Sequence, residues 1–116
     1  MRSIISALAA PFVLFAGSAL AAPYNAVASW YGPYYHGRTT ASGEVFNQYA
    51  LTAAHKTLPF GTRVKVTNTS TGQTVTVRIN DRGPFIGNRE YDLSRAAADA
   101  VGLTASGVRT LQFEIL

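Results

Sequence analysis

Two neighbouring segments in which apolar and polar residues alternate constrain the fold of this chain more than any other feature. In Thr62–Asn68 the valines fall at every second position, and in Thr74–Asn80 two valines and an isoleucine do the same. A period of two places successive side chains on opposite faces of an extended strand. Between the segments, Ser70–Gly72 supplies turn-forming residues. The pair predicts a β-hairpin with one buried face.

Other segments predict further short strands. In Thr110–Leu116 the apolar residues again share one face, and Val27–Tyr31 and Leu51–Ala54 are short apolar runs bounded by turn residues. A helix is expected over Ser94–Val101, where small apolar residues recur at helical spacing and a glycine follows. An all-β chain with one or two short helices predicts a small closed barrel, because closure leaves no exposed sheet edge.

Length and composition narrow the function. The chain has 116 residues, which is room for one domain, and no cysteine, which excludes a disulfide scaffold, a thiolate zinc site and a cysteine nucleophile. Its net charge of +4 favours an anionic partner: cell-wall polymer, membrane surface or nucleic acid. Nucleic acid is disfavoured because no DNA- or RNA-binding motif is present. His36 and His55 have no obvious third ligand, so we expect neither a metal nor another cofactor.

The first 22 residues have the pattern of an export signal. Arg2 precedes an apolar run, Ile4–Ala16, that is too short to be a spanning helix, and Ala19–Ala21 fits the small-x-small cleavage pattern. We therefore expect an exported protein, with residues 23–116 forming its mature domain and with no stable membrane insertion.

Three of the six acidic residues are candidates for chemistry. The other three, Glu90, Asp99 and Glu114, are expected to be solvated surface charges. Asp81 continues the inward face of the second hairpin strand, so it is expected at the barrel rim, where partial burial raises a carboxyl pKa as a general acid requires. The alternative for Asp81 is a structural carboxylate that accepts backbone N–H groups from the turn it starts.

The remaining two candidates and a histidine also have alternatives. Asp92 precedes the expected helix, so it is either a helix N-cap, in competition with Ser94, or an acid that reaches a groove. Glu44 follows a Ser-Gly pair in a loop, which is where sites tend to be built on rigid scaffolds. His55 ends a short apolar segment and is positioned to orient a carboxylate.

Aromatic residues predict a saccharide groove. Trp30, Tyr31 and Tyr35 lie in a glycine-containing segment, and such rings pack on the apolar faces of sugars while their polar tips bond hydroxyls. The residues that we expect to line this groove are Trp30, Tyr31, Tyr35, Arg38, Ser42, Arg82 and Phe85.

Five motifs, in this order, resemble those of the RlpA-like (rare lipoprotein A) domain. The first is the opening, 28–32 with 36–44 (ASWYG and HGRTTASGE), and the others occupy 51–62, 66–68, 80–85 and 92–98 (LTAAHKTLPFGT, VTN, NDRGPF and DLSRAAA). The resemblance implies a six-stranded double-psi β-barrel, a fold shared with the first domain of expansins and with barwin-like proteins. It also implies lytic transglycosylase activity on peptidoglycan, with a preference for glycan strands stripped of stem peptides.

The same resemblance assigns the candidate residues. It places the family's catalytic and groove positions on Glu44, His55 and Asp81, and it matches Asp92 to the essential acid of expansin-like relatives. The chain lacks the lipobox cysteine and the SPOR domain of many family members. We therefore expect a monomeric, soluble protein of the periplasm or cell envelope that acts on glycan strands. The alternative is a non-catalytic, expansin-like wall-binding or wall-loosening protein.

Overall fold

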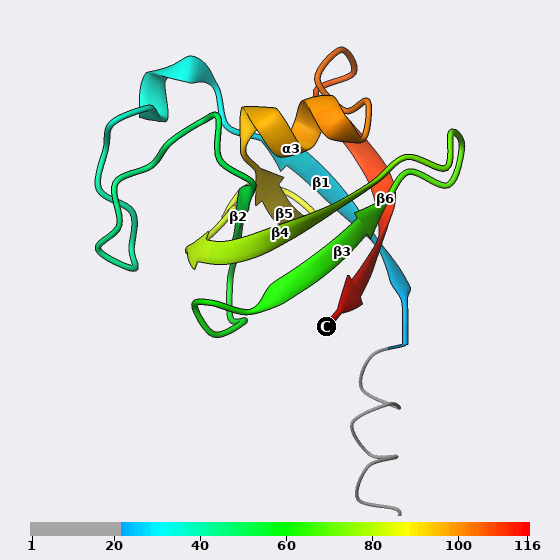
Figure 1. Cartoon of the computed structure of the whole chain (residues 1–116), viewed down its shortest axis with the longest axis horizontal. Coiled ribbons are helices and arrows are strands. Elements are labelled where there is room, and N and C mark those ends of the chain that lie inside the picture. Colours follow the sequence, from blue (N-terminus) through cyan, green and yellow to red (C-terminus); the bar gives the residue numbers. More distant parts are fainter. Residues whose placement is uncertain (1–21) are drawn as a thin grey trace, which may run out of the picture.

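The computed structural model describes residues 22–116, which form a closed six-stranded barrel (Figure 1). Around the barrel the strands follow the order β1-β5-β2-β4-β3-β6. The elements are β1 (Tyr24–Trp30), a 3₁₀ helix η1 (Pro33–Tyr35), β2 (Thr52–His55), β3 (Arg63–Thr67), β4 (Thr74–Asp81), β5 (Arg89–Leu93), α3 (Arg95–Ala100) and β6 (Val108–Ile115). The β1–β5 and β2–β4 contacts are parallel and the other four are antiparallel. This is the double-psi β-barrel that the resemblance implied.

The predicted export signal lies outside the described residues, apart from Ala22. In the part that the structure describes, no helix is long and apolar enough to cross a membrane.

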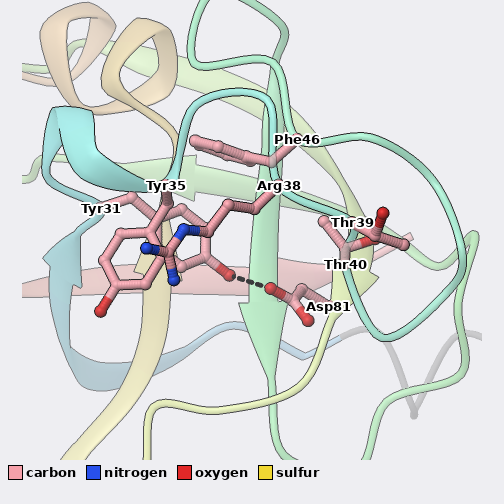
Figure 2. A pocket seen from close by; sticks show the side chains of 7 residues that line it. All are labelled: Tyr31, Tyr35, Arg38, Thr39, Thr40, Phe46 and Asp81. Carbon is pink, nitrogen blue, oxygen red and sulfur yellow. Dashed lines mark hydrogen bonds between the residues drawn. The ribbon is translucent and has the colours of Figure 1, made fainter.

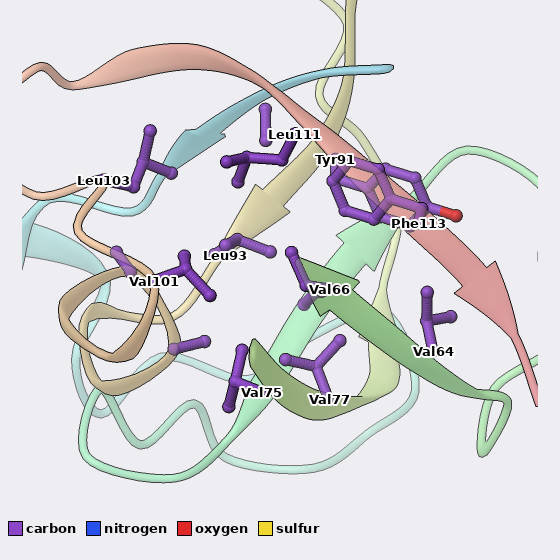
Figure 3. Packing of buried hydrophobic residues seen from close by; sticks show 14 of the residues in the cluster. Val64, Val66, Val75, Val77, Tyr91, Leu93, Val101, Leu103, Leu111 and Phe113 are labelled. Atoms are coloured by element: carbon purple, nitrogen blue, oxygen red, sulfur yellow. The ribbon is translucent and has the colours of Figure 1, made fainter. Parts of the chain in front are cut away.

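The predicted hairpin is confirmed as β3 and β4, and it builds one wall of the core. Val64 lies opposite Val77 and Val66 opposite Val75, and all four side chains are buried. They share one core cluster with the stacked rings of Tyr91 and Phe113, whose centroids are 3.9 Å apart (Figure 3). Burial of this apolar surface is the main favourable contribution to folding. The chain has no disulfide that would add stability by limiting its unfolded state.

One strand was missed and one helix cap needs correction. Strand β5 has only two buried apolar positions, Tyr91 and Leu93, in a segment that otherwise reads as polar. It lies between β1 and β2 and pairs with both. The N-cap of α3 is Ser94, whose Oγ accepts a hydrogen bond from the Ala97 N–H at 3.2 Å. The capping alternative for Asp92 is therefore wrong, because Asp92 lies two residues earlier, within β5.

Candidate functional site

A shift of register in the β2–β4 pair determines where Asp81 lies. Ala53 pairs with Ile79, but the next residue of β2, Ala54, pairs with Asp81, so β4 advances two residues for one of β2. Asp81 therefore shares the face of Ala54 and not the inward face of Ile79. The expectation that Asp81 continues the inward face of its strand is wrong, since strict alternation ends at this irregularity.

The same face of the sheet carries Asp92. Ala54 pairs with Asp81 on β4 and with Asp92 on β5, so the two acids lie on either side of one small residue. Side chains of directly paired residues point to the same face of a sheet. Neighbouring strands are about 4.8 Å apart, which places the two acidic α-carbons about 10 Å from each other. The topology thus brings together two carboxyl groups that are eleven positions apart in the chain.

Aromatic side chains from the long β1–β2 connection cover this face. Tyr31 and Phe46 are buried against Ala54 in a small cluster separate from the barrel core. Their rings meet edge to face, with centroids 4.6 Å apart. A bridge between Thr39 and Val45 ties the connection to itself. The connection is therefore packed on the barrel and can hold side chains in fixed positions beside the two acids.

Two adjoining depressions open between the connection and the barrel. The larger, which we call the main cleft, has a volume of about 450 Å³ and is lined by Ser29, Trp30, Tyr31, Gly32, Tyr35, Asp81, Arg82, Gly83, Pro84, Phe85, Ile86, Arg89 and Asp92. The smaller, the side hollow, has a volume of about 240 Å³ and is lined by Tyr31, Tyr35, Arg38, Thr39, Thr40, Phe46 and Asp81 (Figure 2). Tyr31, Tyr35 and Asp81 line both, so the two depressions adjoin each other along these three residues.

Asp92 is the acid of this site that can hold a proton near neutrality. Burial disfavours its charged form and raises its pKa from 3.8 to about 6, and the nearby charge of Asp81 acts in the same direction. A hydrogen bond from Ser29 Oγ to Asp92 Oδ1 (3.1 Å) and the charge of Arg89 oppose the rise. A carboxyl group with a pKa near the working pH is suited to general acid catalysis.

Asp81 has a different environment, although it borders the same cleft. One oxygen accepts a hydrogen bond from the Tyr31 hydroxyl (2.7 Å), and the other accepts from the backbone N–H groups of Ala41 (2.9 Å) and Arg82 (2.8 Å). The bond from Arg82 is the turn-capping contact that the structural alternative anticipated. The contact with Tyr31 and the exposure to both depressions go beyond that alternative. The carboxylate thus fixes the covering connection and also faces the cleft.

Glu44 lies outside both depressions. Its two oxygens accept hydrogen bonds from both terminal nitrogens of Arg78, at 2.8 and 2.7 Å, and Asn80 Nδ2 lies 3.3 Å from one of them. This bidentate pair lowers the pKa of Glu44, with the Arg78 hydrogen bonds as the main cause. The structure therefore shows Glu44 anchoring the covering connection to β4, at a position where it is not among the residues that line the cleft.

His55 contacts a carboxylate, but not one of the predicted three. Its Nε2 lies 3.1 Å from Glu90 Oε2, and its Nδ1 accepts the backbone N–H groups of Thr57 and Leu58. Because Nδ1 is an acceptor, the ring carries its hydrogen on Nε2 and donates it to Glu90. Glu90 also accepts a bond from the Tyr24 hydroxyl at 3.1 Å, so the expectation of a merely solvated Glu90 is wrong.

Six of the seven predicted groove residues line the site. Trp30, Arg82 and Phe85 line the main cleft, Arg38 lines the side hollow, and the two tyrosines line both. Ser42 lines neither, and its hydroxyl lies 2.9 Å from that of Thr40. The guanidinium of Arg82 donates to the carbonyls of His55 and Leu58 and lies over the Phe60 ring, so it reinforces the cleft wall.

Two lining residues with chemical importance were missed. Ser29 donates to Asp92, and Arg89 lies close enough to that carboxyl to lower its pKa. Ser29 pairs with Asp92 across the parallel β1–β5 ladder. Nothing in the local sequence indicates this pairing, because β5 itself was not recognised. Within residues 22–116, no three His, Cys, Asp or Glu side chains gather in a way that could hold a metal ion.

Comparison with known proteins agrees with this architecture. A family model described as lytic transglycolase matches residues 24–113. The chain is 66% identical over 90 residues to the probable endolytic peptidoglycan transglycosylase RlpA of Synechocystis sp., covering 78% of this chain and 28% of that protein. It is 53% identical over 92 residues to the endolytic peptidoglycan transglycosylase RlpA of Campylobacter jejuni, covering 79% of this chain and 34% of that protein. The chain thus spans about a third or less of the length of these two relatives.

Solved structures share the fold at low sequence identity. The Streptomyces papain inhibitor superposes with a TM-score of 0.67 at 20% identity, covering 84% of this chain and 96% of that one. The expansin of Clavibacter michiganensis superposes with a TM-score of 0.65 at 21% identity, covering 82% of this chain and 50% of that one. The match over nearly all the described residues, together with the identity to curated relatives, shows that this chain belongs to the lytic transglycolase family and carries its double-psi β-barrel.

Proposed function

We propose that this protein is a peptidoglycan lytic transglycosylase that cleaves the bond between MurNAc and GlcNAc, preferably in peptide-free glycan strands, and leaves 1,6-anhydro ends. One observation carries the proposal: Asp92, a carboxyl group whose pKa is raised to about 6 by burial, lines an open cleft of about 450 Å³ beside a second carboxylate, Asp81. Family membership supports the same activity.

Asp92 is the proposed acid and base. Its protonated carboxyl donates to the oxygen that joins C1 of MurNAc to the next GlcNAc, and the C1–O bond breaks. The 6-hydroxyl of the same MurNAc then forms a bond to C1 and returns its proton to the Asp92 carboxylate. No water is consumed, and the carboxyl ends in its starting state. An internal hydroxyl acts at a high effective concentration, so no second carboxylate is needed to activate water.

Asp81 is the proposed electrostatic partner. Positive charge develops at C1 as the bond breaks, and a carboxylate fixed nearby stabilises it. Asp81 meets this requirement because Tyr31, Ala41 and Arg82 hold both of its oxygens in place. We assign to Asp81 the charge-stabilising role, and to Glu44 and His55 the role of positioning the connection and the turn beside the cleft.

The rest of the cleft suits a polysaccharide. Trp30, Tyr35 and Phe85 provide aromatic surface along its walls, on which sugar rings can pack. Both carboxyl groups of the cleft come from a single chain, which supports action as a monomer. We also propose that the protein works in the periplasm or cell envelope without a cofactor, in line with the export signal predicted in the first 22 residues.

The test uses glycan strands and matched Asp-to-Asn variants. Purified protein incubated with peptide-free strands is expected to release fragments with 1,6-anhydro ends, detected by mass spectrometry. Asp92→Asn is expected to abolish this product, whereas Asp99→Asn, at an exposed position on α3, should leave it unchanged. Strand binding without any anhydro product would favour the expansin-like alternative, and undiminished product from Asp92→Asn would overturn the assignment of the acid.

A further inference from the structure

Arg38 presents a cation that nothing in the described part of the chain neutralises. Its side chain makes no hydrogen bond or ion pair within residues 22–116, and its guanidinium carbon lies 5.7 Å from the centre of the Tyr35 ring (Figure 2). By contrast, Arg78 is bound to Glu44, and Arg82 is bound to backbone carbonyls. Arg38 is therefore available to an incoming ligand.

The side hollow around Arg38 combines this charge with apolar walls. Phe46, Tyr31 and Tyr35 supply ring surface, and the hydroxyl of Thr39 adds a further hydrogen-bonding group at the rim. A guanidinium recognises a carboxylate through two parallel N–H bonds. The hollow thus suits a short branch that has an apolar body and ends in a carboxylate.

The position of the hollow connects it to the sugar that reacts. Tyr31, Tyr35 and Asp81 line both depressions, so a ring bound against Asp92 in the main cleft lies next to the hollow. Asp81 itself repels an anion, but three donors share its charge, from Tyr31, Ala41 and Arg82. Arg38 is the one cation among the residues that line the hollow.

We propose that the side hollow is the subsite for the lactyl group of MurNAc and that Arg38 pairs with its free carboxylate. The lactyl group has a methyl-bearing ether body and ends in a carboxylate only where the stem peptide has been removed. Where the peptide is present, that carboxylate is a neutral amide and cannot form the ion pair. Arg38 thereby determines the preference for peptide-free strands. This inference rests on the proposed function for the identity of the sugar.

Binding measured without turnover tests the subsite. In the Asp92→Asn background, affinity is measured for peptide-free glycan strands and for the same strands after their lactyl carboxylates are converted to methylamides. Arg38→Gln is expected to weaken binding of the free-carboxylate strands about tenfold, as loss of a charge-assisted pair does. The same substitution should leave binding of the amidated strands unchanged. Arg109→Gln, on β6, is the matched control for loss of one positive charge and should affect neither.

Each outcome decides the proposal. If Arg38→Gln weakens binding of both kinds of strand equally, Arg38 acts by general attraction to an anionic polymer. If it weakens binding of neither, Arg38 takes no part in recognition. Both results overturn the subsite. Carboxylate-dependent binding that Arg38→Gln removes supports it, even if the unsubstituted protein yields no anhydro product. In that case the proposed activity fails while the subsite stands, so the two failures are distinguishable.

Discussion

Replacement of Asp92 by asparagine is expected to stabilise the protein at neutral pH while it removes activity. Burial raises the pKa of Asp92 from 3.8 to about 6, so folding disfavours its ionised form. Between these two values the native state binds more protons than the unfolded state, and stability falls as the pH rises. Asparagine is neutral at every pH and retains an oxygen that can accept the Ser29 hydroxyl. It therefore avoids the cost of the buried charge.

The size of the effect follows from the pKa difference. A shift from 3.8 to about 6 corresponds to about 3 kcal/mol, since one pKa unit corresponds to about 1.4 kcal/mol. We expect the free energy of unfolding of Asp92→Asn to exceed that of the unsubstituted protein by up to about 3 kcal/mol at about pH 8, and to match it at about pH 3. For a domain of this size the corresponding rise in Tm at about pH 8 is up to roughly 15 °C.

Urea denaturation followed by the fluorescence of Trp30, the sole tryptophan, measures both values. Glu44→Gln is a control with the opposite sign. The hydrogen bonds from Arg78 lower the pKa of Glu44, so the native state favours the ionised carboxylate. The stability that this ionised form contributes is present above the ordinary pKa of 4.5 and is lost as the pH falls through the lowered value. Glu44→Gln should therefore lose stability at about pH 8. Equal or lower stability of Asp92→Asn at that pH would refute the burial of an acid in the cleft.

Three further predictions concern activity. The value of kcat/KM is expected to fall as the pH rises through about 6, because Asp92 must carry a proton to act as the acid. Initial rates of anhydro-end formation, measured from about pH 5 to 8, test this. A rate that rises with pH across this interval would contradict it. Tyr31→Phe removes the hydroxyl bound to Asp81 but keeps the ring against Phe46, so activity should fall roughly tenfold with little change in Tm. His55→Asn retains an acceptor for the two N–H groups of the following turn and should keep more activity and stability than His55→Ala; a folded but inactive His55→Asn would instead indicate proton transfer by the ring.

The two hairpin strands were predictable because their two faces differ. In β3 and β4, valines alternate with polar residues because one face meets the core and the other meets solvent, so composition alone reports the structure. In strand β5, Glu90 binds His55 and Asp92 lines the cleft. The polar residues of β5 interact with other segments of the chain, and the local sequence pattern does not indicate these interactions.

The site was predictable in its residue types more than in its geometry. The aromatic segment and the acids identified a saccharide groove, and Asp81 and Asp92 do meet in one cleft. The register shift between Ala53 and Ala54, which moves Asp81 off the inward face, depends on the pairing of β2 with β4 and has no local signal. The partner of His55 was likewise unpredictable, because Glu90 reaches it from a strand 35 positions away.

The pairing of β2 with both β4 and β5 explains how one barrel gives two carboxyl groups different properties. Asp81 ends its strand, where the chain turns away and supplies backbone N–H donors, so its oxygens are well provided with hydrogen bonds. Asp92 lies inside β5, where the nearby backbone N–H groups pair with β1 and β2. Its carboxyl group accepts a hydrogen bond from one side chain, the Ser29 hydroxyl. The sheet thus places the two acids on either side of Ala54, but it leaves several hydrogen-bond donors beside Asp81 and few beside Asp92. Burial is the main cause of the raised pKa of Asp92, and the one hydrogen bond from Ser29 offsets it only in part.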